Sequence, residues 1–217
     1  MSEKLPPGSD SSPSQDKQKR GTTRRTFLKS AGIVSASVAS AEMLTGVPRA
    51  QAEEQAGAIG PGKVPLKLRV NGEMKTVNVE PRTTLAEALR DELHLTGTKV
   101  VCDRGSCSAC TVMLDKAPVC SCMTLAVDVG DRNVTTIEGL AHGEDLHPIQ
   151  AAFVEHDALQ CGFCTSGMLM SCASLLERNP KPSADDVRTA ISGNICRCAT
   201  YPRVLEAVVA ASQGKGA

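Results

Sequence analysis

The chain has 217 residues and a formal net charge of zero, so its charge balance gives no indication of nucleic-acid binding. Hydrophobic residues make up 41% of the sequence but aromatic residues only 2%, so any core has to be built from aliphatic side chains. Small cores of this kind often need cross-links or metal centres, and the 10 cysteines are the candidates for that role.

The first 52 residues have the pattern of a twin-arginine export signal. Arg24 and Arg25 precede a weakly apolar stretch from Ala31 to about Val47, and an A-x-A cleavage motif ends at Ala52. The apolar stretch is too short and too rich in Ser, Ala and Thr for a membrane span. We therefore predict a soluble periplasmic protein without a membrane span in its mature chain. The alternative interpretation of this segment is a disordered basic tail.

A linker at residues 53–63 leads into a predicted α+β domain at residues 64–140. Apolar and polar residues alternate on both sides of Asn71-Gly72, a strong signal for a β-hairpin. Thr84 and Glu87 have the spacing of a capping box, which opens a helix that ends near Gly97. The strands are predicted at residues 64–70, 76–80, 111–114, 119–125 and 133–137.

Residues 141–217 are predicted to form an all-α domain, a compact bundle of four short helices. Ser183 and Asp186 have the capping spacing of a helix start, and proline residues mark two other starts. The boundary between the domains falls between Glu138 and His147, where Gly and acidic residues interrupt both patterns. The four helices are predicted to begin near His147-Pro148, Thr165 or Ser166, Ser183 and Pro202.

An exported chain with an even number of cysteines normally suggests disulfides, so the spacing of the cysteines has to decide. The first domain holds C-x4-C-x2-C at Cys102, Cys107 and Cys110, with Cys122 further on, which is the plant-type [2Fe–2S] spacing. A zinc site and disulfides are the weaker alternatives. Small residues let this loop close around two irons and turn its amides towards sulfur, namely Gly105, Ser106, Ser108 and Ala109.

The fourth ligand of this first site is open between two cysteines. Cys120 and Cys122 are two residues apart in a predicted strand, so both side chains are expected on the same face and either can reach the cluster. The other one is then a buried free thiol.

The second domain contains two further cysteine pairs, Cys161-x2-Cys164 and Cys196-x-Cys198. Each pair stands in a turn before a predicted helix, so two helix N-termini can converge on one anionic centre. Four thiolates from two turns suit either zinc or a second [2Fe–2S] cluster, and the spacing alone favours zinc. Cys172, on a predicted helix, is expected to be a packed core thiol.

Four segments of the sequence resemble the iron–sulfur subunit of the molybdenum hydroxylases, the family of xanthine dehydrogenase and aldehyde oxidoreductase. They are "CDRGSCSACTV", "SCMTLA", "LQCGFCTSGM" and "GNICRC", and the resemblance runs from about Val64 to about Ala210. With its twin-arginine segment, the sequence is most similar to the periplasmic aldehyde oxidoreductase branch. The resemblance implies a β-grasp, plant-type ferredoxin domain followed by a four-helix-bundle domain, with a [2Fe–2S] cluster in each, which reverses the preference for zinc.

The resemblance also implies roles for individual residues. It places the outer cluster near FAD in a medium-sized partner subunit and the inner cluster near a molybdopterin cofactor in a large partner subunit. Gln160 and Cys198 match positions that lie close to the pterin. The implied outer ligands are Cys102, Cys107, Cys110 and Cys122, and the implied inner ligands are Cys161, Cys164, Cys196 and Cys198.

By this resemblance the chain is expected to be the electron-transfer subunit of a heterotrimeric oxidoreductase that converts aldehydes to carboxylates, with no catalytic residue of its own. The same relay in a dehydrogenase of an N-heterocycle, such as isoquinoline, nicotinate or xanthine, is the alternative. A stand-alone ferredoxin-like carrier is disfavoured by the additional helical domain. An exported binding module held by disulfides or zinc is a further class, and it predicts no iron chromophore.

Three positions depart from the pattern of the family. Ser108 stands where Gly is usual, and Ser166 stands where many members have Pro. Ala199-Thr200 replaces the usual residues before Tyr201. None of the three removes an implied ligand, but Ser108 is expected to alter the amide geometry of the first cysteine loop, and the Ala199-Thr200 change leaves the packing on the pterin side open.

Overall fold

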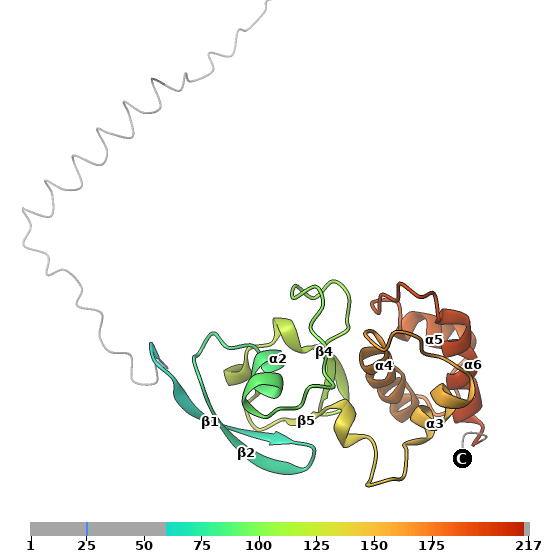
Figure 1. Ribbon diagram of the computed structural model, residues 1–217, viewed down its shortest axis with the longest axis horizontal. Helices are drawn as coiled ribbons and strands as arrows, with labels where there is room; N and C mark the ends of the chain where they lie inside the picture. The colour runs from blue at the N-terminus through green and yellow to red at the C-terminus, as the bar shows by residue number, and fades with distance from the viewer. Residues whose placement is uncertain (1–24, 26–59, 215–217) are drawn as a thin grey trace, which may run out of the picture. The chain divides into compact units, whose positions relative to one another are not determined.

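The computed structural model describes Arg25 and residues 60–214 (Figure 1). The rest of the predicted export signal, and the linker up to residue 59, lie outside the described residues, so these remain predictions. Residues 60–214 belong to one compact unit. Within them, no helix combines the length and the apolar character that crossing a membrane requires.

A mixed sheet of five strands, in the order β2-β1-β5-β3-β4, forms the first half of the fold (Figure 1). β1 and β2 form the predicted antiparallel hairpin, and its two turn residues, Asn71 and Gly72, both have positive φ. β5 lies parallel to β1 and antiparallel to β3, which places the first and last strands side by side. The strands are β1 Val64–Val70, β2 Glu73–Val79, β3 Thr111–Leu114, β4 Ala117–Cys120 and β5 Asn133–Thr135.

A short helical segment packs against this sheet. It consists of α2 (Leu85–Glu87) and the π-helical η1 (Ala88–Glu92), and it begins with the predicted capping box. Leu85 and Leu89 are fully buried in one aliphatic core with strand residues. The segment ends earlier than the predicted Gly97, because His94 has a φ of 59°, which a right-handed helix excludes. Sheet and helix together form the predicted ferredoxin-like half.

The predicted strand at residues 119–125 is wrong over most of its length. β4 ends at Cys120, and Ser121–Met123 form a single turn of 3-10 helix, η2. Ser121 makes this turn, since its N–H and its hydroxyl both donate to the carbonyl of Cys110, at 3.3 and 2.7 Å. Cys120 and Cys122 therefore do not share a face of one strand, as the alternation argument requires.

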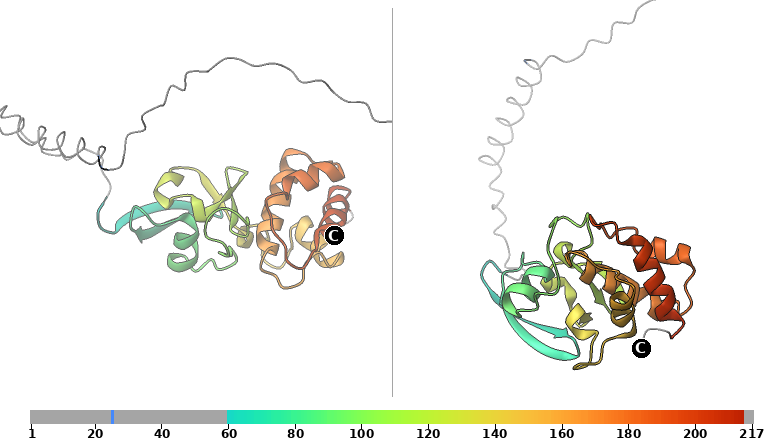
Figure 2. Two further views of the ribbon diagram at one scale, coloured as in Figure 1. Left: turned by 90° about the horizontal axis from the view of Figure 1, so that it is seen from above. Right: turned by 45° about the vertical axis from the view of Figure 1, so that its right-hand side comes forward.

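The second half consists of four helices, as predicted (Figure 2). Their apolar faces meet in one core in which Phe153, Met168 and Val204 are fully buried. Pro148 and Pro202 occupy the first turns of their helices, where the missing N–H costs no hydrogen bond. The helices are α3 Pro148–Glu155, α4 Thr165–Arg178, α5 Ala184–Ala190 and α6 Tyr201–Ser212.

β3 and α4 join the two halves directly. Met113 of β3 is buried in the same core as the helices rather than in the core of the sheet. The hydroxyl of Ser174 on α4 donates to the carbonyl of Lys116, at 2.7 Å. Gly167 of α4 lies so close to the first cysteine loop that an added Cβ would stand 2.2 Å from the carbonyl oxygen of Ser108. The cysteine loop is thus packed against the second half of the molecule.

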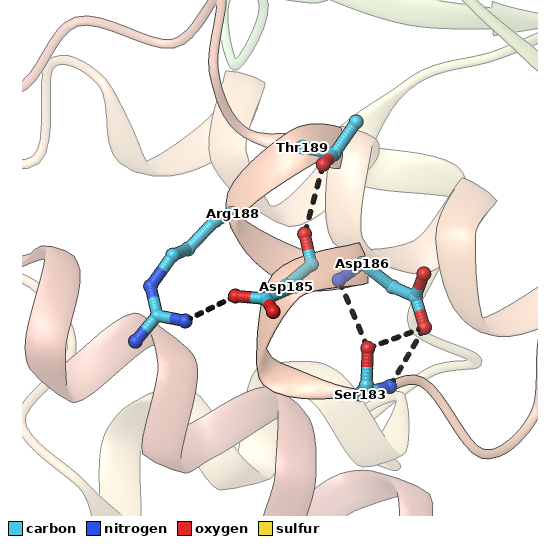
Figure 3. A network of polar contacts seen from close by, with 5 residues as sticks. All are labelled: Ser183, Asp185, Asp186, Arg188 and Thr189. Atoms are coloured by element: carbon cyan, nitrogen blue, oxygen red, sulfur yellow. Dashed lines mark hydrogen bonds and ion pairs between the residues drawn. The ribbon is translucent and has the colours of Figure 1, made fainter.

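α5 begins with the predicted cap at Ser183 (Figure 3). The Ser183 hydroxyl accepts from the N–H of Asp186 at 3.2 Å, while the Ser183 N–H donates to the Asp186 carboxylate at 2.8 Å. The bond from the Ser183 N–H, followed by one that the Ser183 hydroxyl donates to the same carboxylate, holds the pKa of Asp186 below its ordinary value. Arg188 pairs with Asp185 at 2.6 Å, and the Thr189 hydroxyl donates to the Asp185 carbonyl. The network fixes the first turn of α5.

Candidate metal centres

The first cysteine loop lies between η1 and β3 and reverses direction several times. Asp103, Gly105 and Ser108 have φ angles of 52°, 70° and 53°, in the left-handed region, and these positions bend the chain around its own cysteines. The carbonyl of Ser108 accepts from both the N–H and the hydroxyl of Thr111, at 3.3 and 2.7 Å, which fixes the end of the loop to β3.

The four predicted cysteines of the first site lie together as two pairs of thiols. Cys102 and Cys107 are neighbours whose thiols act on each other's pKa, and Cys110 packs against Cys122 in one small buried cluster. The first pair is half-buried and the second pair is buried. Gly105 also donates its N–H to the sulfur of Cys122, at 3.3 Å.

Backbone amides of the loop stabilise negative charge on one of these sulfurs. The N–H of Arg104, followed by the Cys107 thiol, lowers the pKa of Cys102 to about 7. Burial has the opposite effect on Cys107 and Cys110 and raises the pKa of both thiols. Of these three thiols, only that of Cys102 is shifted towards the thiolate form that a metal ligand requires.

The second site is built from two turns, one before α4 and one before α6. Cys164 stands at the start of α4, and the preceding turn passes through Gly162, with a φ of 86°. The turn that carries Cys196 and Cys198 bends at Ala199, with a φ of 60°, before α6 begins.

The thiols of the second site also stand in two pairs. The strongest thiol neighbour of Cys164 is Cys196 and that of Cys198 is Cys161, while Cys161 also acts on Cys164 and Cys196 on Cys198. Burial raises the pKa of Cys196, but hydrogen bonds from the hydroxyl and the N–H of Thr200 outweigh it and bring the value down to about 7. The Thr200 hydroxyl lies 3.2 Å from the Cys196 sulfur. Burial raises the pKa of Cys164 to about 12.

The pairing of the thiols fits a two-iron cluster. In a [2Fe–2S] cluster with four cysteine ligands, each tetrahedral iron takes two thiolates, so the sulfurs approach in two pairs. Both quartets have this arrangement, although their members come from separate segments of the chain. Among the described residues, no group of three or more His, Cys, Asp or Glu side chains is arranged so that it could hold one metal ion.

The two remaining cysteines differ from each other. Cys172 is fully buried in the helical core, as predicted, and burial raises the pKa of its thiol to about 12. Cys120 lies beside the first site, with its sulfur 3.7 Å from the hydroxyl of Ser108 and 3.9 Å from the carbonyl of Gly105. Of the two cysteines considered for the fourth position, Cys122 is the more buried.

Three further predicted positions have defined surroundings. Gln160 is exposed next to Cys161, which is exposed as well, so the predicted pterin-facing residues share an accessible edge with the second site. The hydroxyl of Ser166 is buried and has no hydrogen-bond partner among the described residues. The hydroxyl of Thr200 forms a hydrogen bond with the sulfur of Cys196. The sequence did not suggest this role for a residue that departs from the family pattern.

A set of contacts between the two cysteine segments was not predicted. The N–H of Ile195 donates to the carbonyl of Cys107 at 3.1 Å, and the side-chain amide of Asn194 donates to the carbonyl of Ser108 at 3.1 Å. Figure 2 shows the first loop beside the turn that precedes α6. Asn194 is buried, although its place in "GNICRC" suggests no more than a turn residue. The two sites therefore share one hydrogen-bonded frame.

Tyr201 completes this frame and is the only tyrosine of the chain. Its hydroxyl accepts from the N–H of Cys196 at 2.8 Å and donates to the carbonyl of Asn194 at 3.1 Å. The single tyrosine that follows the cysteine turn was the feature of the sequence from which this contact could have been predicted.

We expect Tyr201→Phe to lower the free energy of unfolding by about 1–3 kcal/mol, because the N–H of the buried Cys196 loses its acceptor. The thermal midpoint of the intact protein measures this loss. Ser212→Ala is the matched control, since it removes a hydroxyl bond at the other end of α6, to the carbonyl of Val209. Equal losses in both variants contradict a special role for Tyr201.

Two family models match the chain. The "2Fe-2S iron-sulfur cluster binding domain" matches residues 68–136, and the "[2Fe-2S] binding domain" matches residues 136–209. The first model covers the sheet and the first cysteine quartet, and the second covers the four helices and the second quartet.

Individual proteins are similar over most of the chain. The aldehyde oxidoreductase iron-sulfur-binding subunit PaoA of Escherichia coli O157:H7 is 41% identical in an alignment 201 residues long that covers 86% of this chain and 86% of that one. The nicotine 6-hydroxylase small subunit of Paenarthrobacter nicotinovorans is 49% identical over 147 residues, 68% of this chain and 88% of that one. In the crystal structure of quinoline 2-oxidoreductase from Pseudomonas putida 86, one chain superposes with a TM-score of 0.67 and 45% identity, over 70% of this chain and 98% of that one.

Proposed function

Because the chain belongs to the family of [2Fe–2S] subunits of the molybdenum hydroxylases, we propose that it binds a cluster in each half and relays electrons from a molybdopterin centre to FAD. The observation that carries this proposal is that each cysteine quartet gathers within the half of the chain that a [2Fe–2S] family model matches. Both cofactors at the ends of the relay belong to partner subunits, a large one and a medium-sized one, in a heterotrimer.

We assign the ligands by these pairs. In the first site, Cys102 and Cys107 hold one iron, and Cys110 and Cys122 hold the other. In the second site the iron pairs are Cys161 with Cys198 and Cys164 with Cys196. When bound, such clusters accept and release one electron at a time.

The protein groups around the sulfurs offset the charge of four thiolates. In the first site, backbone N–H groups donate to Cys102 and Cys122. In the second, Thr200 donates to Cys196, and Cys164 lies at the N-terminus of the 14-residue helix α4, where the helix dipole favours negative charge. Each site also buries one side and leaves the other open, with Cys161 exposed and Cys102 half-buried. The open sides are where partner subunits can approach within reach for electron transfer.

We place Gln160 and Cys198 at the surface that faces the molybdopterin. Gln160 is exposed directly before Cys161, and the thiol of Cys161 contacts that of Cys198. A cofactor in a large subunit that approaches this edge therefore meets both residues together.

For the substrate and the compartment, we propose an aldehyde oxidoreductase of the periplasm. The similar Escherichia coli subunit belongs to an aldehyde oxidoreductase by its name, and a match over 86% of the chain extends N-terminally beyond residues 60–214. The predicted export segment, with Arg24 and Arg25 at its basic end, lies on that side of the chain. The second candidate is a dehydrogenase of an N-heterocycle, which the 49% identity to the nicotine 6-hydroxylase small subunit favours.

Purification of the complex with its partner subunits tests the proposal. We expect about four irons per copy of this chain and two distinguishable EPR signals after reduction with dithionite, one for each [2Fe–2S] cluster. Zinc in either site, or a single signal, contradicts the two-cluster assignment. Comparing benzaldehyde with nicotinate as substrate decides between the two candidates, and fractionation of cells that express the full chain decides the compartment.

A further inference from the structure

A fifth sulfur borders the first site and has no task in the proposed relay. Cys120 is the last residue of β4, and its side chain is only partly buried against Ala86, Cys110 and Cys122. Its thiol contacts the thiol of Cys110, and the charge of Cys102 also acts on it. The first site therefore gathers five cysteines, one more than a [2Fe–2S] cluster needs.

Gly105 lies between Cys120 and Cys122. Its N–H donates to the sulfur of Cys122 at 3.3 Å, while its carbonyl accepts from the thiol of Cys120 at 3.9 Å. Cys110 and Cys122 share one small buried cluster, and Cys120 packs against it. The sulfurs of Cys120 and Cys122 both lie beside Cys110, and both bond to the backbone of Gly105. Each is therefore close to the position of the iron that Cys110 holds.

The surroundings of Cys120 are compatible with its sulfur replacing that of Cys122 as an iron ligand. Ser108 places its hydroxyl 3.7 Å from the Cys120 sulfur, and it can donate to that sulfur without moving the backbone. Cys120 ends β4, where it pairs with Thr111 of β3, and Cys122 lies in the turn η2 that follows directly. The second site offers no equivalent, because Cys172 is fully buried in the helical core.

We propose that Cys120 is a reserve ligand of the first cluster, able to take the position of Cys122 on the iron that Cys110 also holds. The exchange involves no electron transfer. With a cluster bound, the Cys120 thiol would give its proton to solvent and its thiolate would bind the iron, while the Cys122 thiolate would leave that iron and take up a proton, so charge and protons balance. The proposal rests on the first quartet binding a cluster, as argued above.

The test uses the full chain purified with its partner subunits. Iron per chain and the EPR spectrum of the reduced complex are compared for the wild type, Cys120→Ala, Cys122→Ala and the double variant. Cys102→Ala is the matched control, because it removes a ligand of the other iron, whereas Cys120 packs against Cys110 and Cys122. Cys122→Val repeats the main variant with a side chain that fills the buried site, and the signal of the second cluster reports correct folding in every sample.

We expect the wild type, Cys120→Ala and both Cys122 variants to keep about four irons per chain, whereas Cys102→Ala and the double variant keep about half of that. The Cys122 variants are expected to show a shifted signal for the first cluster only, since its fourth sulfur differs. The inference is overturned if the Cys122 variants lose as much iron as Cys102→Ala. If the wild type itself lacks the first cluster, that result contradicts the proposed function, and it is thereby distinguished from a failure of the inference about Cys120.

Discussion

Replacing Cys164 with alanine is expected to reduce the iron of the purified complex from about four to about two atoms per chain and to remove one of its two EPR signals. Cys164 stands at the start of α4, and its thiol contacts Cys196, so the two together are assigned to one iron of the second site. With only one thiolate left for that iron, the cluster loses its tetrahedral coordination. The first site draws on separate cysteines and is expected to keep its signal.

Cys172→Ala is the control for this prediction, since Cys172 is a buried cysteine on the helix that Cys164 caps. Its removal leaves a small cavity in the helical core, and the expected result is a loss of about 0.5–3 kcal/mol in the free energy of unfolding with the full iron content. Full iron in Cys164→Ala, or half the iron in Cys172→Ala, contradicts the assignment of these two thiols.

The spacing of the cysteines predicted more of the site than of its surroundings. A C-x4-C-x2-C run is a local pattern, and the loop it describes is closed by local φ angles at Gly105 and Ser108, so its three cysteines are recognisable without tertiary information. The pairing of Cys110 with Cys122 depends instead on the turn η2, which Ser121 makes by bonding to the carbonyl of Cys110. Period-two alternation predicts a straight strand there and contains no sign of this bond.

The contact between the two halves could not be predicted from the sequence either, because the hydrophobic pattern of each half describes only its own core. Strand alternation and helix periodicity predict a core for each, and β1, β2 and the four helices follow those predictions. Neither pattern shows that Met113 of β3 is buried among the helices, or that Asn194 bonds to the carbonyl of Ser108. These contacts join residues far apart in the chain, so only the folded arrangement identifies them.

Gly167→Ala tests whether this junction holds the first cysteine loop in place. In an ordinary helix the substitution stabilises, by about 1 kcal/mol, because alanine has the higher helix propensity. Here the added Cβ would stand 2.2 Å from the carbonyl oxygen of Ser108 and 3.0 Å from two backbone atoms of Ala109, none of which can rotate away. Overpacking of this kind costs about 1–3 kcal/mol, so we expect the variant to be less stable than the wild type.

The same substitution is expected to move the EPR signal of the first site while that of the second stays unchanged, because Ser108 and Ala109 lie between the ligands Cys107 and Cys110. Gly193→Ala is the matched control: its Cβ would stand 3.1 Å from the hydroxyl of Ser108, the end of a side chain that can turn aside. We expect only a small change in the thermal midpoint and in the spectrum of this second variant. A higher midpoint for Gly167→Ala, with both signals intact, would mean that helix propensity outweighs the contact and that α4 does not position the cluster loop.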